Sequence, residues 1–284
     1  MKKKILGVIG DPIAHSISPA MHNAALKALN MDQEMEYKAF HVKPKNLGKF
    51  LQEVREKGYL GINVTIPHKV TVMEHLDEIT QYAKIVGAVN TVKNEDGKLI
   101  GYNTDGPGFL EAIKNKLGIT PEGKKVVLLG AGGAAKAVGM ILAENKATQI
   151  VIYDVDETKT IHLTEQITSN FETKVIGLPS KNNDLNEYIA DCDLLVNATP
   201  IGMHPKENMS PLPPNTIINP HTYIYDLVYN PAETQLAKQA KASGAKATTG
   251  LSMLVYQGAL AFTVFTGINA PVEVMEKAAQ KALH

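Results

Sequence analysis

Polar side chains gather at three places in the first part of the chain, each at the end of an apolar run or a hairpin strand. They supply amide, hydroxyl, amine and carboxylate groups, which can bind ligand hydroxyls and move protons. A lone lysine after a buried strand is usually surface decoration, but three such clusters together are what a cleft for a small polar substrate needs. The clusters are Asn63, Thr65 and Lys69 in GINVTIPHK, Asn90 in GAVNTV, and Asn103 and Asp105 in GYNTD.

Two serines lie two positions apart in the loop GDPIAHSISPAMH. The hydroxyls of Ser16 and Ser18 could bind a polyhydroxylated or carboxylate ligand. Capping explains Ser18 equally well, because it would be the N-cap of a helix that has Pro19 at its first position. His15 and His22 lack the i, i+4 spacing of a helical metal pair and have no carboxylate cluster beside them. We therefore expect no metal site.

A glycine-rich turn in VVLLGAGGAA joins a β-branched run to a long amphipathic helical pattern. Gly130, Gly132 and Ala135 form a G-x-G-x-x-A pattern: the first permits a tight turn, the second a close approach of pyrophosphate, and the third close helix–strand packing. An anion would lie on the free N–H groups of the helix. The context predicts a dinucleotide site, with a purely structural turn as the alternative.

The next predicted strand, QIVIYD, ends at Asp154, which follows Gly130 by 24 positions. An acid about 20 residues after the turn meets the adenosine ribose in dinucleotide-binding folds. A carboxylate there accepts hydrogen bonds from both ribose hydroxyls and repels a 2′-phosphate. The spacing therefore favours NAD, although a strand that simply ends in solvent could also end in an acid.

The first unit alternates strands and helices, and its pattern predicts an α/β fold with a mostly parallel sheet. A second unit begins near Asp105, and its buried strand runs predict a doubly wound parallel sheet. In the first unit we expect strands at 4–10, 35–42 and 60–67, helices at 18–30, 46–58, 69–76 and 78–87, and a hairpin at 88–105. In the second we expect strands at 149–154, 193–200 and 223–231 and helices at 234–244 and 251–267.

Composition excludes several classes of protein. The 284 residues carry 29 basic and 29 acidic side chains, so no global charge draws the chain to nucleic acid or an anionic membrane. No run approaches the roughly 18 apolar residues that a membrane span needs. The single cysteine, Cys192, permits no internal disulfide and is interpreted as a buried structural thiol. These features predict a cytoplasmic protein without nucleic-acid or membrane partners.

Seven motifs, in their order along the chain, give it a recognisable resemblance. They are GDPIAHSISPAMHNAA, GINVTIPHK, GAVNTV, GYNTDGPGF, LGAGGAAKAV, NATPIGM and TGLSMLVYQGALAF. Together they resemble the shikimate dehydrogenase family, including its quinate/shikimate branch, from about residue 4 to residue 267. The resemblance implies a substrate domain at 1–104, a Rossmann coenzyme domain at 105–248 and C-terminal helices at 249–284 that return to the first domain.

The same resemblance implies roles for individual residues in substrate binding and catalysis. Lys69 and Asp105 would form the catalytic pair. Lys69 would be the main acid/base group and Asp105 its orienting partner. Ser16, Ser18 and Tyr229 would bind the substrate carboxylate. The ring hydroxyls would be held by Asn63, Thr65, Asn90, Asp105 and Gln257.

On the coenzyme side, Thr199 would approach the ribose and nicotinamide, and Gly250 and Met253 would line the nicotinamide pocket. NADP-using members typically read Asn-Arg-Thr-x-x-Arg (or Lys) after the second strand. This chain has Asp154, Val155 and Asp156 there and keeps only the final basic residue, Lys159. That departure resembles NAD-using members, so NAD is expected and NADP is the alternative. The pyrophosphate turn would comprise Gly130, Ala131, Gly132, Gly133, Ala134 and Ala135.

The implied reaction is reversible hydride transfer between the coenzyme and C3 of shikimate or 3-dehydroshikimate, in the chorismate pathway to aromatic amino acids. An alternative is NAD-dependent quinate/shikimate dehydrogenase of quinate catabolism, although Ser18 matches the biosynthetic enzymes. A non-catalytic metabolite sensor would be expected to lack the pair formed by Lys69 and Asp105. Another alternative is a two-domain Rossmann dehydrogenase acting on folate or glutamyl-tRNA. The combination of NVTIPHK and GYNTDG argues against it, and the zero net charge gives no sign of the basic face that a tRNA partner needs. The resemblance leaves monomer and homodimer both open.

Overall fold

The computed structural model describes residues 3–180 and 184–283, and the chain divides into two compact units. Unit 1 comprises Met1–Gly108 and Leu254–His284, and unit 2 comprises Phe109–Met253. Both divisions fall inside helices, α4 (Asp105–Ala112) and α9 (Leu251–Thr266). The first division follows Gly108, four residues beyond the boundary expected after residue 104. The second follows Met253, five residues beyond the boundary expected after residue 248. Each of the two helices therefore begins in one unit and ends in the other.

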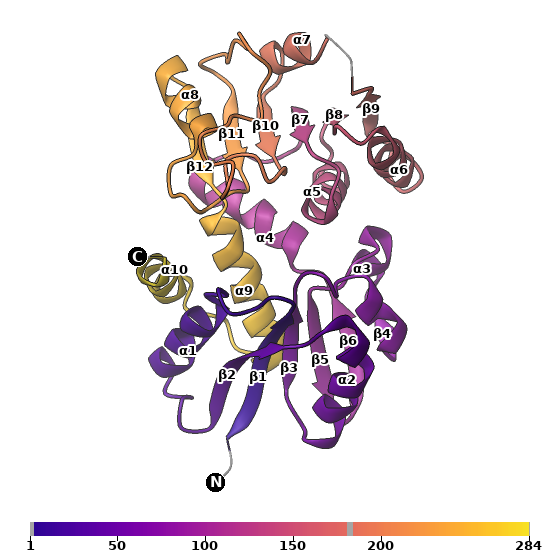
Figure 1. The fold of residues 1–284 in the computed structure, drawn as a ribbon, viewed down its shortest axis with the longest axis vertical. Helices are drawn as coiled ribbons and strands as arrows, with labels where there is room; N and C mark the ends of the chain where they lie inside the picture. Colours follow the sequence, from indigo (N-terminus) through magenta and orange to yellow (C-terminus); the bar gives the residue numbers. More distant parts are fainter. Residues whose placement is uncertain (1–2, 181–183, 284) are drawn as a thin grey trace. The chain divides into compact units, whose positions relative to one another are not determined.

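Unit 1 is built on a six-stranded sheet with the order β2-β1-β3-β5-β6-β4 (Figure 1). The strand β1 pairs in parallel with β2 and β3, whereas β5 is antiparallel to both β3 and β6. The parallel part places the carboxyl ends of β1 and β3 at one edge of the sheet. The strands are β1 (Lys4–Gly10), β2 (Met35–His41), β3 (Gly61–Val64), β4 (Glu78–Ile79), β5 (Thr91–Glu95) and β6 (Lys98–Tyr102).

Helices cover both faces of this sheet. Alternate side chains of β1 point to opposite faces, and each set packs against a different helix. Leu6 and Val8 pack with Phe265 of α9, whereas Ile9 packs with Leu51 of α2. The last helix packs on α1, and residues Leu254–His284 belong to unit 1. The helices are α1 (Ser18–Ala28), α2 (Leu47–Glu56), α3 (Gln81–Val86), α10 (Val272–Ala282) and the short 3-10 turns η1 (Pro44–Asn46) and η2 (Thr71–His75).

Unit 2 is a doubly wound sheet of six parallel strands in the order β12-β11-β10-β7-β8-β9. The order reverses between β10 and β7, and ligands bind outside the carboxyl ends of the strands at such a point. The strands are β7 (Lys125–Leu129), β8 (Gln149–Tyr153), β9 (Lys174–Leu178), β10 (Leu194–Asn197), β11 (Tyr223–Asp226) and β12 (Lys246–Thr249). The helices are α5 (Gly133–Glu144), α6 (Glu157–Thr168), α7 (Leu185–Ala190), α8 (Gln235–Ser243) and a π turn, η3 (Ile113–Leu117).

The structure confirms the predicted α/β class and corrects several local predictions. Ser18 is not the N-cap of α1 but its first residue; Ile17 precedes it, and the Ser18 N–H donates to Ser16 Oγ instead. The expected helix at 78–87 is split, because Glu78–Ile79 pairs with β6 as a strand. The expected helix at 69–76 is a shorter 3-10 turn. The edge strands β9 and β12 had no clear sequence signal.

A buried histidine lies in the core of unit 1. The ring of His22, on α1, stacks on Tyr37 of β2 with the centroids 4.0 Å apart and the planes 10° apart. His22 is 1% exposed, and its Nδ1 has no hydrogen-bond partner. Burial lowers the pKa of His22 to about 3, because desolvation disfavours the imidazolium. The ring is therefore neutral and acts as an aromatic packing group.

We expect this histidine to make folding stability pH-dependent. Its folded pKa lies below the unfolded value of about 6.5, so the unfolded chain binds a proton that the native chain does not. Stability is present above that value and is lost as the pH falls toward 3, by about 1.4 kcal/mol per pH unit from this group. Urea unfolding of His22→Phe and wild type from pH 8 to pH 4 should give curves that diverge below pH 6.5. Parallel curves would contradict the assignment.

A glycine on β3 should be intolerant of any side chain. A Cβ on Gly61 would lie 2.5 Å from the Phe265 ring and 2.7 Å from the Val92 carbonyl oxygen, and the backbone oxygen cannot move freely. We expect Gly61→Ala to lower the free energy of unfolding by about 2–3 kcal/mol, as overpacking does. Gly48→Ala on α2 is the matched control, because it meets only the exposed ring of His75 and gains helix propensity. Equal effects in the two variants would contradict the packing argument.

Candidate functional site

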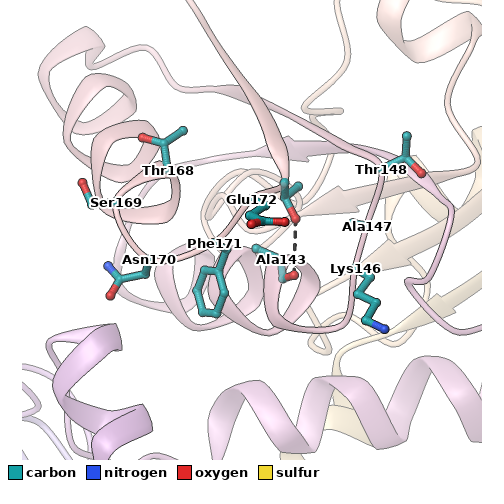
Figure 2. Close-up of a pocket in the computed structure, with 10 residues that line it drawn as sticks. Ala143, Lys146, Ala147, Thr148, Thr168, Ser169, Asn170, Phe171 and Glu172 are labelled. Carbon is teal, nitrogen blue, oxygen red and sulfur yellow. Dashed lines mark hydrogen bonds between the residues drawn. The ribbon is translucent and has the colours of Figure 1, made fainter.

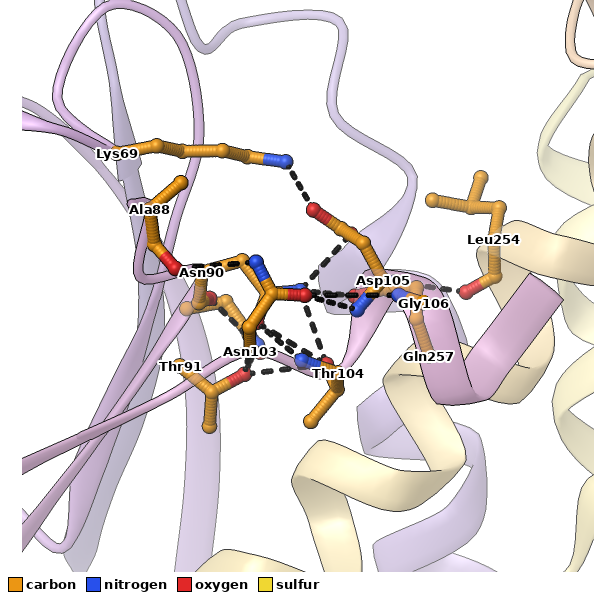
Figure 3. Close-up of polar contacts among 11 residues, drawn as sticks. Lys69, Ala88, Asn90, Thr91, Asn103, Thr104, Asp105, Gly106, Leu254 and Gln257 are labelled. Carbon is orange, nitrogen blue, oxygen red and sulfur yellow. Dashed lines mark hydrogen bonds and ion pairs between the residues drawn. The ribbon is translucent and has the colours of Figure 1, made fainter. Parts of the chain in front are cut away.

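A lysine–carboxylate ion pair is the centre of the polar cluster in unit 1. Lys69 follows β3, and its Nζ lies 2.7 Å from Oδ2 of Asp105, the first residue of α4 (Figure 3). The side chains are 27% and 11% exposed, so the pair is largely removed from water yet still reachable. The Lys69 carbonyl accepts the Val89 N–H at 2.8 Å, which fixes the backbone beside the pair. A helix N-terminus also favours the Asp105 carboxylate.

Asn90 holds the other oxygen of that carboxylate. Its Nδ2 donates to Asp105 Oδ1 at 2.9 Å, to Thr104 Oγ1 at 2.9 Å and to Gln257 Oε1 at 3.3 Å. Its Oδ1 accepts the Thr104 N–H at 2.8 Å. The chain thus reaches the same point from the hairpin, from α4 and from α9. Sequence reasoning expected Asn90, Asp105 and Gln257 at one site, and the structure brings them together (Figure 3).

Asn103 lies two residues before α4, and its side chain binds both the start of that helix and the segment before β5. Its Oδ1 accepts the Asp105 N–H at 3.0 Å, and its Nδ2 donates to the Ala88 carbonyl at 3.0 Å. These bonds satisfy a free N–H of the helix and tie α4 to the segment before β5. Asn103 therefore positions Asp105 through the backbone.

Asn63 has its amide group engaged within the protein. The Nδ2 donates to the Asn90 carbonyl at 3.3 Å and to Thr91 Oγ1 at 3.0 Å, while Oδ1 accepts from the Tyr37 hydroxyl at 2.7 Å. Both amide hydrogens are used, so a ligand could meet only a remaining lone pair of Oδ1. Thr65 follows directly after β3, and its methyl group covers Gly10. Tyr37 and Thr91 were missed because both read as ordinary strand residues.

Ser16 lies in the loop before α1, and Ser18 is the first residue of that helix. The Ser16 N–H donates to the Ile13 carbonyl at 3.0 Å, and Ser16 Oγ accepts the Ser18 N–H at 3.4 Å. The Ser18 side chain makes no capping bond, and both residues are partly exposed. Both hydroxyls can therefore still donate to a ligand.

The glycine turn in unit 2 has the geometry that a pyrophosphate site requires. Gly130 has φ +99°, and a Cβ there would lie 3.0 Å from the Ala198 backbone, so only glycine fits. Gly132 is the N-cap of α5 and has no side chain to fill the helix end. Ala135 is fully buried, whereas Gly133 and Ala134 lie exposed at the first turn. The free N–H groups suit an anion such as the pyrophosphate of a dinucleotide.

Asp154, directly after β8, binds this turn. Its Oδ2 accepts the Ala131 N–H at 2.8 Å, and its Oδ1 accepts the Asp156 N–H at 2.9 Å. Asp156 in turn caps α6 and pairs with Lys159 at 3.1 Å. The hydrogen bond from Lys159 holds the pKa of Asp156 below its ordinary value. Val155 is 82% exposed and has no charge to offer a phosphate.

A second polar chain runs along the carboxyl ends of β10 and β11. Thr199 Oγ1 donates to Asn197 Oδ1 at 2.7 Å, and Asn197 Nδ2 donates to Asp226 Oδ1 at 2.8 Å. Thr234 Oγ1 donates to Asp226 Oδ2 at 2.6 Å. Burial raises the pKa of Asp226. Asn197 and Asp226 were missed, although each ends a strand and so falls where this fold binds ligands.

The remaining predicted residues of unit 2 lie after β11 and β12. A Cβ on Gly250 would lie 2.0 Å from the Leu227 carbonyl oxygen. The packing of the backbone is therefore by itself enough to require glycine at this position. The Met253 N–H donates to the Tyr225 hydroxyl at 3.0 Å, and the side chain is 8% exposed. Tyr229 is partly buried, and desolvation raises its pKa.

An open depression lies elsewhere on unit 2 (Figure 2). The ends of α5 and α6 form it, and a bond from Thr173 Oγ1 to the Ala143 carbonyl at 3.3 Å crosses it. None of the predicted site residues lines it. Its lining residues are Ala143, Lys146, Ala147, Thr148, Thr168, Ser169, Asn170, Phe171, Glu172 and Thr173.

The described residues contain neither a candidate metal site nor a candidate membrane-spanning helix. No group of three or more His, Cys, Asp or Glu side chains within 3–180 and 184–283 is placed to hold a metal ion. Among the helices of the same ranges, none has the length and apolar character to cross a membrane.

Three family models match separate parts of the chain. The shikimate dehydrogenase substrate binding domain matches residues 8–92, and the shikimate 5′-dehydrogenase C-terminal domain matches 250–280. The saccharopine dehydrogenase NADP binding domain matches residues 126–206.

Similar proteins cover nearly the whole chain. Shikimate dehydrogenase (NADP(+)) of Methanopyrus kandleri is 44% identical over 274 residues, 96% of this chain and 94% of its own. Shikimate 5-dehydrogenase from Listeria monocytogenes, in complex with shikimate and NAD, is 35% identical with TM-score 0.92, covering 97% and 96%. Quinate dehydrogenase from Corynebacterium glutamicum, in complex with NAD, is 30% identical with TM-score 0.90, covering 98% and 99%.

Proposed function

Because the chain belongs to the shikimate dehydrogenase family, we propose that it interconverts shikimate and 3-dehydroshikimate at C3 as a step toward aromatic amino acids. Its enzyme class, an oxidoreductase acting on a CH–OH group, follows from that membership. The observation that carries the proposal is the ion pair between Lys69 and Asp105, enclosed by Asn90 and Gln257.

Proton transfer is the part of the reaction that this cluster can perform. A bound nicotinamide coenzyme supplies the hydride chemistry, and the protein supplies orientation and acid/base groups. Asp105 holds the Lys69 nitrogen at 2.7 Å, and an ammonium group in that place could give a proton to a ketone oxygen. In the oxidation direction the same nitrogen, when neutral, takes the hydroxyl proton. Asp105 accepts from Lys69 and Asn90 and so orients the lysine.

The other polar residues of unit 1 fit the parts of a polyhydroxylated carboxylate. Ser16 and Ser18 offer hydroxyl donors for a carboxylate, and Tyr229 stays a prediction as their partner. Thr65 and Gln257 would hold ring hydroxyls together with Asn90. Asn63 would contribute an acceptor only, since its amide hydrogens bind Asn90 and Thr91.

Removing the lysine should abolish most of the catalysis while leaving substrate affinity. We expect Lys69→Ala to lower kcat by roughly 10²–10⁴-fold, the usual contribution of a positioned acid/base group, with KM for shikimate little changed. Asp105→Asn should also be severely impaired. Steady-state kinetics in both directions provide the measurement. Lys57→Ala is the control, because that lysine pairs with Glu53 on the exposed side of α2. Near-normal turnover in Lys69→Ala would overturn the assignment.

We propose NAD as the favoured coenzyme. Each oxygen of Asp154 accepts one backbone N–H and keeps a lone pair for a ribose hydroxyl. Lys159, the basic residue that follows on the first turn of α6, is paired with Asp156. A 2′-phosphate would thus meet carboxylates and the uncharged Val155. The Listeria monocytogenes protein is described with NAD, whereas the Methanopyrus kandleri relative is named for NADP.

A matrix of initial rates tests coenzyme and substrate together: shikimate and quinate, each with NAD⁺ and NADP⁺. We expect kcat/KM with shikimate to be at least about tenfold higher for NAD⁺, because like charges in contact cost several kcal/mol. Val155→Arg with Asp154→Asn should shift the ratio toward NADP⁺, and Lys159→Ala should change it little. A strong NADP⁺ preference in the wild type would refute the proposed role of Asp154.

Quinate is the second candidate substrate. The Asp-x-Asp stretch at Asp154 resembles the NAD-using quinate/shikimate branch, and the Corynebacterium glutamicum protein is a quinate dehydrogenase with NAD. Against it, Ser18 matches the biosynthetic enzymes, although one methyl group in a pocket changes specificity by only about 1–3 kcal/mol. Activity on neither substrate would leave a metabolite sensor as the better interpretation.

We place this activity in the cytoplasm on the chemistry of the thiol. Cys192 is buried and donates to the Ile189 carbonyl at 3.2 Å, and burial raises its pKa to about 12. Such a thiol is unreactive, in keeping with a structural role in a reducing compartment.

A further inference from the structure

A directed chain of buried hydrogen bonds runs from the core of unit 1 to the ion pair. The Tyr37 hydroxyl donates to Asn63 at 2.7 Å, and Asn63 donates to Thr91 at 3.0 Å. Thr91 donates to Asn90 at 3.1 Å, and Asn90 donates to Asp105 at 2.9 Å. Figure 3 shows the part of the chain from Thr91 onward. Every donor thus points toward the carboxylate that binds Lys69.

Two backbone groups fix the direction of this chain. One side of the Asn63 amide faces the Asn90 carbonyl, which only accepts, so that side must be the NH₂ group. The oxygen of Asn63 therefore faces Tyr37, which must donate. One side of the Asn90 amide faces the Thr104 N–H, which only donates, so its NH₂ group must face Asp105. Neither amide can flip without opposing two donors or two acceptors.

Tyr37 is held in place independently of the chain. Asn23 of α1 accepts the Tyr37 N–H and donates to its carbonyl, both at 2.9 Å, on the free edge of β2. The neutral ring of His22 stacks on the phenol. Burial raises the pKa of Tyr37 well above its ordinary value, so the hydroxyl keeps its proton and stays a donor.

Burial excludes a direct role for the first members of the chain. Tyr37 is 1% exposed and Thr91 is fully buried, so neither can touch a substrate or a coenzyme. Water has little access to replace a donor lost at Tyr37, because Tyr37 is 1% exposed and its partner Asn63 is 7% exposed. The consequence of losing one bond should therefore pass along the chain.

We propose that Tyr37 is a positioning residue for catalysis, which acts through Asn63 and Asn90 to fix the carboxylate of Asp105 beside Lys69. This inference rests on the proposed function of that pair. It gives Asn63 a second role, as a link in the chain, beside the acceptor that we propose it offers to the substrate.

The test removes a single hydroxyl and keeps the aromatic ring. Tyr37→Phe should lower kcat for shikimate oxidation roughly tenfold, because the free energy of one buried hydrogen bond corresponds to about that factor in rate. The KM values for shikimate and coenzyme should stay within about twofold of those of the wild type. Tyr59→Phe is the matched control, because it removes a hydroxyl that binds only Glu53 at the surface of the same unit. Should Tyr37→Phe fail to fold, Thr91→Val breaks the next link and should give the same loss of kcat.

A double-mutant cycle separates positioning from general loss of stability. In an Asn63→Ala background, Tyr37→Phe should change kcat by less than about twofold, because the link it acts through is gone. An undiminished effect in that background, or a wild-type kcat in Tyr37→Phe itself, would overturn the proposal.

An activity-free measurement keeps this inference distinct from the proposed function. The side-chain amide signals of Asn63 and Asn90 in ¹H–¹⁵N spectra should exchange faster with solvent in Tyr37→Phe than in Tyr59→Phe. If the wild type turns over neither shikimate nor quinate but this difference appears, the proposed function fails and the hydrogen-bond chain stands. If the wild type is active and neither the amide signals nor kcat changes, the chain fails alone.

Discussion

The carboxylate of Asp105 is the group on which the site in unit 1 depends. It is 11% exposed, so it has lost most of its water and must be compensated by protein groups. Lys69 supplies a charge at one oxygen and Asn90 supplies an N–H at the other. Removing water from such a pair costs free energy that replacement by apolar residues would not. A role in stability therefore does not explain the pair, which is in keeping with the proton transfer that we propose for it.

Unit 2 uses carboxylates at the ends of parallel strands in a different way. Asp154 follows β8 and Asp226 ends β11, and each accepts hydrogen bonds from neighbouring segments. Asp154 holds the turn at Ala131, while Asp226 holds Asn197 and with it Thr199. These acids shape the loops at the carboxyl edge of the sheet, where a doubly wound fold binds its ligand.

The sequence was sufficient for the fold class and for the residues whose chemistry is local. The G-x-G-x-x-A turn, Asp154 and the pair of Lys69 and Asp105 could all be found from spacing or resemblance. Asn63 was also predicted as a site residue. Its hydrogen bond with Tyr37 could not be predicted, because Tyr37 lies 26 positions away on another strand.

Pairing between distant segments explains the other differences. Glu78–Ile79 is a strand only because β6 lies beside it, and a two-residue strand has no periodicity of its own to detect. Ser18 is a suitable N-cap by residue type, yet the chain enters α1 through Ile17 in a helical conformation, and Ser16 accepts the free N–H. Residue propensities therefore predict the start of α1 only approximately, and the conformation of the preceding loop determines which residue is the first of the helix.

The hydrogen bonds of Asp154 make coenzyme choice and loop geometry interdependent. NADP-using members of the family typically have asparagine at this position, and an amide can accept only through its oxygen. Here both sides of the carboxylate face backbone donors, the N–H groups of Ala131 and Asp156. An asparagine would oppose its NH₂ group to one of them, so either the glycine turn or the start of α6 would have to move. The selectivity that we propose for NAD would therefore rest only partly on charge repulsion, because the hydrogen bonds of Asp154 also hold the glycine turn.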